Sequence, residues 1–301
     1  MVIKTMKRMK KISTFIAFVA AAALCACNND NDNQAVWRVP QPAVESLYGM
    51  FPEAQNVGWY TSGNYVVAKF RTPQSGGAVQ NRWAWFDGAG TWYMTETDMA
   101  LAQMPQAVQA SFGASDYASW TFLDGDRLER AGLTDIYVIE VDGTGNNRGT
   151  SVALYFTAVG TGVKTVFNPS RNYHYSDMVP ALLPAEVSAF VQSHYPAAQL
   201  IGSYFGNRLS RVEILDEGVA RTLWFDGDND WLYTVTQTEP AELPETVTTA
   251  LNESDYAAYT VSGTYYYNTP DGDFYRLLLT QGSRSVEVDI TPEGSLTVVG
   301  Q

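Results

Sequence analysis

The chain has 301 residues, with 32 acidic and 19 basic side chains and a formal net charge of −13 at pH 7. Five of the basic residues lie before position 12, so the remainder carries 14 basic against 32 acidic side chains and repels phosphate backbones, which excludes nucleic-acid binding. Both cysteines, Cys25 and Cys27, lie near the amino terminus, and the rest of the chain therefore has no disulfide, thiol nucleophile or cysteine metal site.

Residues 1–26 are typical of an export signal. Lys4 to Lys11 supply a positive head, Ile12 to Ala26 form an apolar stretch of about fifteen residues, and small residues precede Cys27. The stretch is shorter than the roughly twenty residues of a spanning helix, although an uncleaved amino-terminal anchor is the alternative. Leu24-Cys25-Ala26-Cys27 resembles the signal of bacterial lipoproteins, which implies that Cys27 becomes the lipidated first residue.

Residues 27–38 are predicted to be a disordered tether. Asn28 to Asn33 alternates amide and acid without an apolar side chain, so this segment cannot bury enough surface to order itself. Its acidic character resembles the export tag of surface lipoproteins in the Bacteroidetes. We therefore expect a protein held at the outer membrane through its lipid alone, on either the periplasmic or the cell-surface face.

An internal duplication dominates the remaining sequence. Arg82 to Gly88 (RWAWFDG) recurs as Arg221 to Gly227 (RTLWFDG), and the same offset of 139 aligns 39 consecutive positions without a gap, 15 of them identical. Phe51 to Gln55 also corresponds to Tyr195 to Gln199 after a small change of register. The predicted organisation is a first domain at 39–169, a linker at 170–181 and a second domain at 182–301.

Each copy is expected to contain two halves, in which a short helix precedes a meander of strands. Four runs have apolar residues at helical spacing, and prolines stand before three of them (Pro105, Pro184 and Pro244). The helical positions are Val44, Leu47, Tyr48 and Phe51; Val108 and Phe112; Val187, Phe190, Val191 and Tyr195; and Val247, Ala250 and Leu251. β-Branched and aromatic residues predict strands at 65–71, 135–141, 152–157, 210–215, 274–280 and 285–290.

Turn signals separate these strands. They are Asp87-Gly88, Asp124-Gly125, Asp142-Gly143, Asp226-Gly227, Asp271-Gly272 and Glu293-Gly294. Helices are too few for parallel crossovers, so the sheets should be antiparallel. The predicted fold class is α+β, with two tandem domains of antiparallel β-sheet whose short helices pack on one face and leave the other to solvent or a partner.

These motifs resemble one protein family. The sequence resembles the PepSY-like, β-lactamase-inhibitor-protein-like lipoproteins of the Bacteroidetes. The resemblance is carried by a helix with Pro near its start, by the aromatic-Pro-x-Ala-Gln steps at Phe51 and Tyr195, and by the Phe-Asp-Gly hairpins that are followed by Trp92 and Trp231. The resemblance covers nearly all of the mature chain as two tandem units. It implies a helix-on-sheet fold and an inhibitory or binding role, and it transfers no catalytic residue.

Candidate chemical sites are weak. Asp226, Asp228 and Asp230 place carboxylates at alternate positions, as in the opening of a calcium loop, but no Gly or bidentate Glu follows at the required positions, so a hairpin turn is the preferred interpretation. Asp124-Gly125-Asp126 and Asp271-Gly272-Asp273 are interpreted in the same way. His174 and His194 lie near no serine motif. We therefore expect no enzyme and no cofactor.

The tryptophans and tyrosines are the better candidates for a binding surface. In the repeated strand, Trp85 and Trp224 lie opposite the face of Ala84, Phe86, Leu223 and Phe225, so they fall on the open side if the latter set faces the helices. The candidate binding residues are Trp83, Trp85, Trp92, Trp224, Trp231 and Tyr266. The alternative is that these tryptophans pack into the core.

The expected function is a non-catalytic envelope lipoprotein that binds a protein partner, an envelope or secreted protein, through an open sheet face. A glycan-binding surface lipoprotein is the alternative, because flat aromatic rings also suit sugar rings. A structural subunit of an envelope complex is a third possibility.

Overall fold

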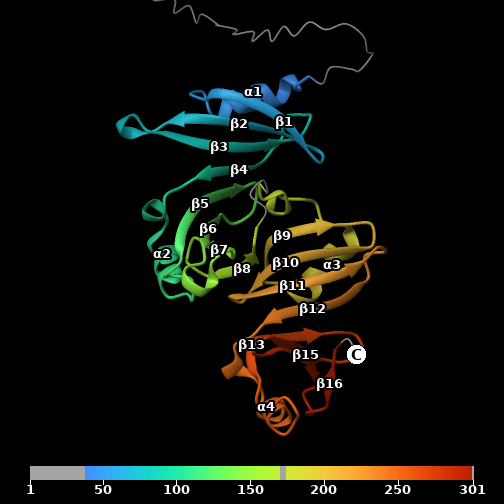
Figure 1. The fold of residues 1–301 in the computed structure, drawn as a ribbon. Coiled ribbons are helices and arrows are strands. Elements are labelled where there is room, and N and C mark those ends of the chain that lie inside the picture. The colour runs from blue at the N-terminus through green and yellow to red at the C-terminus, as the bar shows by residue number, and fades with distance from the viewer. Residues whose placement is uncertain (1–37, 170–173, 300–301) are drawn as a thin grey trace, which may run out of the picture. The chain divides into compact units, whose positions relative to one another are not determined.

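The computed structural model describes residues 38–169 and 174–299. The predicted signal peptide, Cys27 and all of the predicted tether except Arg38 lie outside the described residues. The described chain consists of a helix followed by four antiparallel strands, repeated four times (Figure 1).

The first two repeats form one sheet of eight strands in the order β1 to β8. Its elements are α1 (Gln41–Met50), β1 (Gln55–Ser62), β2 (Tyr65–Pro73), β3 (Val79–Phe86), β4 (Trp92–Asp98), α2 (Gln106–Gly113), β5 (Thr121–Arg130), β6 (Ile136–Asp142), β7 (Ser151–Thr157) and β8 (Gly162–Phe167).

The last two repeats form a second sheet of eight strands, again in sequence order. Its elements are α3 (Ala185–His194), β9 (Gln199–Phe205), β10 (Leu209–Asp216), β11 (Val219–Asp226), β12 (Trp231–Gln237), α4 (Glu245–Asn252), β13 (Thr260–Asn268), β14 (Phe274–Gln281), β15 (Arg284–Ile290) and β16 (Leu296–Val298). The predicted fold class is confirmed, including the four helices and the antiparallel sheets.

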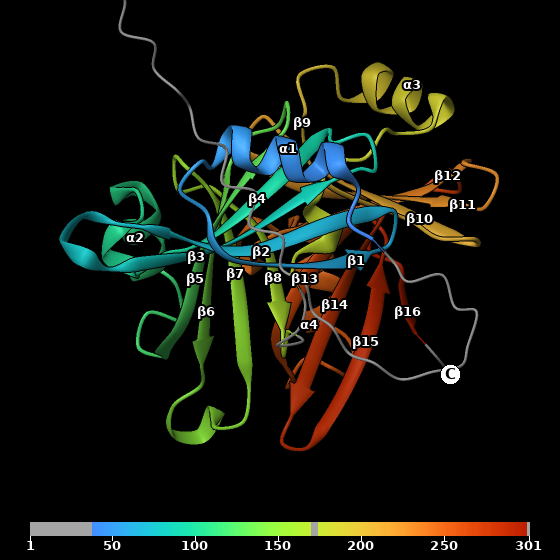
Figure 2. The ribbon, with the colours of Figure 1, turned by 90° about the horizontal axis from the view of Figure 1, so that it is seen from above.

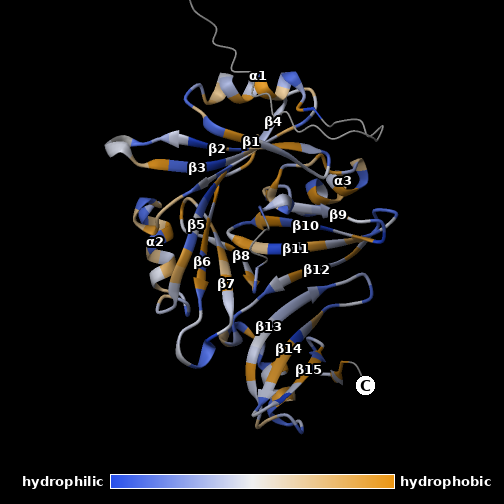
Figure 3. Cartoon of the chain, turned by 45° about the horizontal axis from the view of Figure 1, so that its top comes forward, coloured by the Kyte–Doolittle hydropathy of each residue, from blue (hydrophilic) through white to orange (hydrophobic). Residues whose placement is uncertain are grey.

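Each helix begins directly after a proline, which lacks the N–H group that a first turn cannot satisfy. Each then buries a narrow apolar stripe on one face of its sheet. Leu47 of α1 packs against Ala84 and Phe86, and Val187 of α3 packs against Leu223 and Phe225. In strands such as β15, apolar and polar residues alternate accordingly (Figure 3). In contrast, β7 of the first sheet carries apolar residues on both faces. The predicted stripe of α1 is wrong at Tyr48, which is 45% exposed.

The opposite face of the first sheet, here called the helix-free face, is not open. Trp85, Met94 and Tyr155 lie on it in one hydrophobic cluster with Tyr175 and Met178 from the predicted linker. Ile201 and Leu215 of the second sheet join the same cluster. The expectation of an uncovered face is therefore wrong for the first sheet: its apolar side chains are buried by the chain that leads into the second copy.

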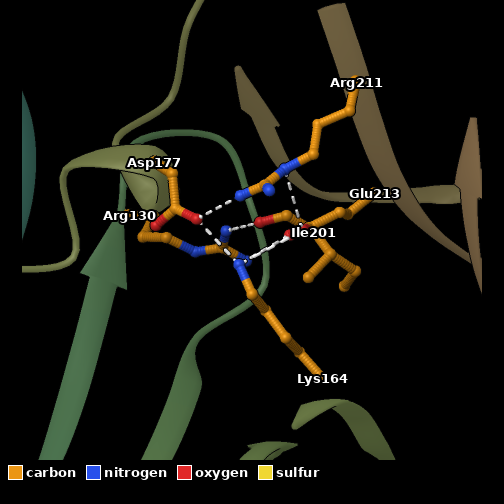
Figure 4. A network of polar contacts seen from close by, with 6 residues as sticks. All are labelled: Arg130, Lys164, Asp177, Ile201, Arg211 and Glu213. Atoms are coloured by element: carbon orange, nitrogen blue, oxygen red, sulfur yellow. Dashed lines mark hydrogen bonds and ion pairs between the residues drawn. The ribbon is translucent and has the colours of Figure 1, made fainter. Parts of the chain in front are cut away.

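Charged groups hold this cover in place (Figure 4). Asp177, in the short 3₁₀ turn Ser176–Met178, accepts hydrogen bonds from Lys164 of β8 at 2.7 Å and from Arg211 of β10 at 2.9 Å. Lys164 also lies 3.1 Å from Glu213 of β10. Arg130 of β5 donates to the carbonyl of Ile201 in β9, and burial lowers the pKa of its guanidinium to about 10. β8, which lies beside β7 as the last strand of the first sheet (Figure 2), also contacts β11 of the second sheet.

Candidate functional site

The predicted binding tryptophans divide between the two faces of each sheet. Trp83 and Trp85 lie on the helix-free face as expected, and they are buried, with exposed fractions of 8% and 1%, so the alternative that they pack into the core holds for these two residues. Trp224, at the position of Trp85 in the second copy, is only half-buried on the helix-free face of the second sheet. The two copies therefore use one strand position differently.

Trp92 and Trp231 do not lie beside Trp85 and Trp224. A β-bulge after each hairpin turn pairs Phe86 with Trp92 and Phe225 with Trp231, which moves both indoles to the helix side. The indole of Trp231 stacks on Phe190 of α3 with the ring centroids 5.1 Å apart. Each indole also donates to a threonine hydroxyl three residues later, Trp92 at 2.9 Å and Trp231 at 3.1 Å, so both are structural.

Tyr266 also lies on the side of the helices, because it pairs with Tyr275, which packs in the cluster around α4. Its hydroxyl donates to Asp273, and burial is the largest of the effects that raise the pKa of its phenol. Its neighbours Tyr265 and Tyr267 point to the opposite face by strand alternation. Tyr266 is therefore separated from Trp224 by the sheet itself.

An aromatic row crosses the helix-free face of the second sheet. Trp224 and Tyr233 are cross-strand partners, with ring centroids 6.1 Å apart, and Tyr233 lies 5.7 Å from Tyr267. Tyr267 in turn stacks on Phe274 at 4.8 Å. All four rings are half-buried. We call these four residues, with Tyr204, the aromatic row.

Tyr204 and two arginines extend the row at its ends. Tyr204 of β9 is 55% exposed, and the guanidinium of Arg211, its cross-strand partner, lies 6.0 Å from its ring. At the other end, Arg276 lies 4.8 Å from the ring of Tyr267 and donates to both carboxylate oxygens of Asp289, at 2.7 and 2.8 Å. Guanidinium groups of this kind stack on rings and still keep their fixed partners.

The predicted calcium-like loop is a hairpin turn. Asp226 Oδ1 accepts the backbone N–H groups of Asp228 and Asp230, each at 2.9 Å. Asp87 closes the corresponding turn of the first copy in the same way, with Ala89 and Thr91 as donors. The search of the described residues for groups that could hold a metal identifies a different set, Glu96, Asp98 and Asp126.

This acidic cluster lies on the helix-free face of the first sheet. Glu96 and Asp98 are two residues apart on β4, and Asp126 of β5 is the cross-strand partner of Asp98. Each residue offers an oxygen within 4.8 Å of the others. The exposed fractions of Glu96 and Asp126 are 4% and 3%, whereas Asp98 is half-buried.

Neighbouring side chains satisfy only part of the acidic cluster. Tyr175 donates to Asp126 Oδ2 at 2.7 Å, Asn81 donates to Asp98 Oδ2 at 2.6 Å, and His174 Nδ1 lies 3.3 Å from Glu96 Oε1. Within the described part of the chain, Glu96 Oε2 and Asp126 Oδ1 are buried without a hydrogen-bond partner. Buried carboxylate oxygens in this state are costly.

The electrostatics of the acidic cluster agree with this geometry. Burial is the largest cause that raises the pKa of Glu96, Asp98 and Asp126, and the charge of Glu96 is the next cause for Asp126, whose pKa lies well above its ordinary value. Burial, followed by the charge of Glu96, raises the pKa of Tyr60 of β1 to about 12. Three carboxylates at this spacing therefore resist ionising together.

A surface hollow of about 250 Å³ reaches the edge of the acidic cluster. Asp98 lines it together with Asn81, Asp124, Met99 and Ala100. Asp98 thus connects the buried carboxylates to solvent.

The sequence did not reveal this cluster. Asp124-Gly125-Asp126 was expected to be a turn, and that expectation is wrong, because all three residues lie inside β5. Gly125 serves packing instead: a Cβ there would lie 2.5 Å from Met104 Cε and 2.8 Å from the carbonyl oxygen of Met99. The usable signal was the pair of acids two residues apart on each of two adjacent strands. His174 belongs to the cluster, whereas His194 contacts Ser193 and the carbonyl of Phe190.

Comparison with known proteins places the fold in one family. The family model described as "Putative beta-lactamase-inhibitor-like, PepSY-like" matches residues 66–163 and 210–297, which together are more than half of the chain. No curated protein matches. In the described part of the chain, no helix is long and apolar enough to cross a membrane.

Three solved structures from Bacteroides are similar to part of the chain. A DUF2874 family protein of Bacteroides uniformis is 26% identical with a TM-score of 0.39, covering 44% of this chain and 90% of its own. A BLIP-like protein of Bacteroides fragilis is 26% identical with a TM-score of 0.40, covering 46% and 94%. A protein of Bacteroides eggerthii titled as periplasmic is 23% identical with a TM-score of 0.41, covering 46% and 95%. From the two regions that its model matches, the chain belongs to the β-lactamase-inhibitor-like, PepSY-like family.

Proposed function

We propose that this protein is a non-catalytic envelope lipoprotein that binds a protein partner through the aromatic row on the second sheet. The supporting observation is that Tyr204, Trp224, Tyr233, Tyr267 and Phe274 lie on the face that carries no helix, with arginines at both ends. Tryptophan, tyrosine and arginine are the residue types that contribute most to the affinity of protein interfaces.

The family description supports a binding role over catalysis, since it names an inhibitor-like fold. The acidic chain suits a partner with a basic surface, because opposite potentials speed association. The chemistry of the row also suits a glycan, since sugar rings stack on flat aromatic rings, and glycan binding is the second candidate.

The partner can be tested by placing a photo-cross-linking amino acid at Tyr204 or Tyr267 in the producing cells. Val159, which is 78% exposed in the turn between β7 and β8, supplies the matched control position. We expect one discrete cross-linked protein from the row positions and none from Val159, and the product should disappear when Trp224→Ala is added. Equal products from all positions, or none from the row, would contradict protein binding, and oligosaccharide affinity lost in Trp224→Ala would favour the glycan.

Anchoring is proposed through Cys27, on the evidence of the tetrapeptide and its flanks. The Cys27→Ser protein should move from the membrane fraction to the soluble envelope fraction, because the lipid is the only membrane attachment proposed. Unchanged retention in the membrane fraction would show that lipidation is not the anchor.

A further inference from the structure

The acidic cluster has the dimensions of a cation site. Ca²⁺ binds carboxylate oxygens at roughly 2.4 Å, so two ligands on opposite sides of the ion are about 4.8 Å apart. Glu96, Asp98 and Asp126 each offer an oxygen within 4.8 Å of the others. The spacing therefore allows one ion to contact all three side chains at once.

The unpartnered oxygens point to a missing ligand. Glu96 Oε2 and Asp126 Oδ1 belong to side chains more than nine-tenths buried, and no donor in the described residues reaches them. The neighbouring donors, Tyr175 and Asn81, are already directed at Asp126 Oδ2 and Asp98 Oδ2. A bound cation would satisfy these oxygens and offset the repulsion among the carboxylates.

The second copy shows that the fold does not need these acids. The offset of 139 aligns Glu96 with Val235, Asp98 with Gln237 and Asp126 with Tyr265. The strand register agrees, because Asp98 pairs with Asp126 and Gln237 pairs with Tyr265. The same two strands thus form with apolar, amide or aromatic side chains at these positions, and the acids belong to the first copy alone.

From these three observations we infer that Glu96, Asp98 and Asp126 bind a hard divalent cation of the Ca²⁺ type on the helix-free face of the first sheet. All the side-chain ligands are oxygens, which Ca²⁺ and Mg²⁺ prefer over the nitrogen and sulfur that zinc takes. Asp98, at the edge of the 250 Å³ hollow, is the ligand that an entering ion meets first. Tyr175 and His174 connect the site to the segment that covers this face.

The test uses the chain carrying Cys27→Ser, stripped of metal with EDTA and titrated with CaCl₂ by calorimetry, with MgCl₂ as a second titrant. We expect one site per chain and a melting temperature that rises with the calcium concentration. Glu96→Gln and Asp126→Asn should each weaken binding at least tenfold. Asp228→Asn, in the exposed hairpin, is the matched control and should leave binding unchanged.

Terbium locates the ion independently. Tb³⁺ takes oxygen sites of the calcium type and emits when a nearby indole is excited, and Trp83 is the cross-strand partner of Glu96. The emission should fall in Trp83→Phe and be displaced by calcium. Gln and Asn are neutral and have nearly the same shape as Glu and Asp. Glu96→Gln and Asp126→Asn should therefore fold without metal and melt no lower than the metal-free parent protein.

Three results would overturn the inference. The first is no heat and no change in melting temperature with either ion at millimolar concentration, which would mean that the acids share protons instead of binding metal. The second is undiminished binding in both Glu96→Gln and Asp126→Asn. The third is an equal loss in Asp228→Asn, which would indicate non-specific attraction to an acidic chain.

Discussion

Replacing Trp85 by Ala tests whether the helix-free face of the first sheet is a core. The indole is 1% exposed, and a buried tryptophan covers roughly 150–250 Å², so at about 25 cal/mol per Å² its burial contributes on the order of 4–6 kcal/mol. Against this, the Nε1–H of Trp85 has no partner in the described residues, and an unsatisfied buried donor costs about 1–3 kcal/mol. We therefore expect Trp85→Ala to lower the free energy of unfolding by about 3–4 kcal/mol.

Trp224→Ala is the matched comparison, because Trp224 occupies the same strand position in the second copy and is only half-buried. Its expected loss is smaller, because part of its indole stays exposed to solvent in the folded state. Urea denaturation followed by far-UV circular dichroism measures both, provided the m-values agree. Trp85→Phe should lose less than Trp85→Ala, because it keeps most of the apolar contact and removes the unpartnered donor. If Trp85→Ala costs no more than Trp224→Ala, then the linker and second sheet do not cover this face as described.

Two further predictions concern charged groups. Asp177→Ala removes one of the two carboxylates that Lys164 and Arg211 share, the other being Glu213, and should cost about 2–3 kcal/mol. The loss should exceed that of Asp216→Ala, which removes one partner of Arg221 at 3.3 Å and leaves its hydrogen bond to Thr236; similar losses would show that the network adds nothing. In EDTA, the raised pKa values of Glu96 and Asp126 mean that the folded state holds protons that the unfolded state releases, so stability should fall as pH rises from about 4 through the raised pKa values. The melting temperature of the Glu96→Gln/Asp126→Asn protein should depend less on pH across this range than that of the parent protein. An identical dependence on pH would contradict the assignment of the raised pKa values to Glu96 and Asp126.

The fold followed from local patterns in the sequence. Prolines before short apolar stripes located the helices, and the repeat at an offset of 139 showed that the meander occurs in two copies. The unpredicted feature of the fold is the cover over the first sheet. The linker sequence has no sustained period, yet Tyr175, Met178 and Val179 are nearly or fully buried against Trp85 and its neighbours. Such long-range burial depends on where the second copy packs, and no local pattern specifies that.

The candidate sites were predicted less well than the fold, because the face on which a strand residue lies depends on the pairing register of the strands. A single bulge residue in each hairpin moves Trp92 and Trp231 to the helix side, and a glycine inside β5 resembles a turn when only its neighbours in sequence are considered. The acidic cluster joins residues 28 positions apart through the pairing of Asp98 with Asp126. An assignment of strand register, which the sequence did not supply, was needed to bring those carboxylates together.

The duplication helps to separate structural positions from candidate binding positions. Residues that recur in both copies were first considered as binding residues, but most of them are structural. Residues identical in both copies hold the fold: Asp87 and Asp226 close the hairpins, and Trp92 and Trp231 donate to threonines. The three positions of the acidic cluster have no structural role that both copies share, since each is filled in two chemically unlike ways. The three acids of the first copy correspond to Val235, Gln237 and Tyr265 at the aligned positions of the second copy. Recurrence of Trp85 as Trp224 is therefore no evidence of a shared binding role, because Trp85 is fully buried and Trp224 is not, and divergence at Glu96, Asp98 and Asp126 is the better indication of a ligand in the first copy.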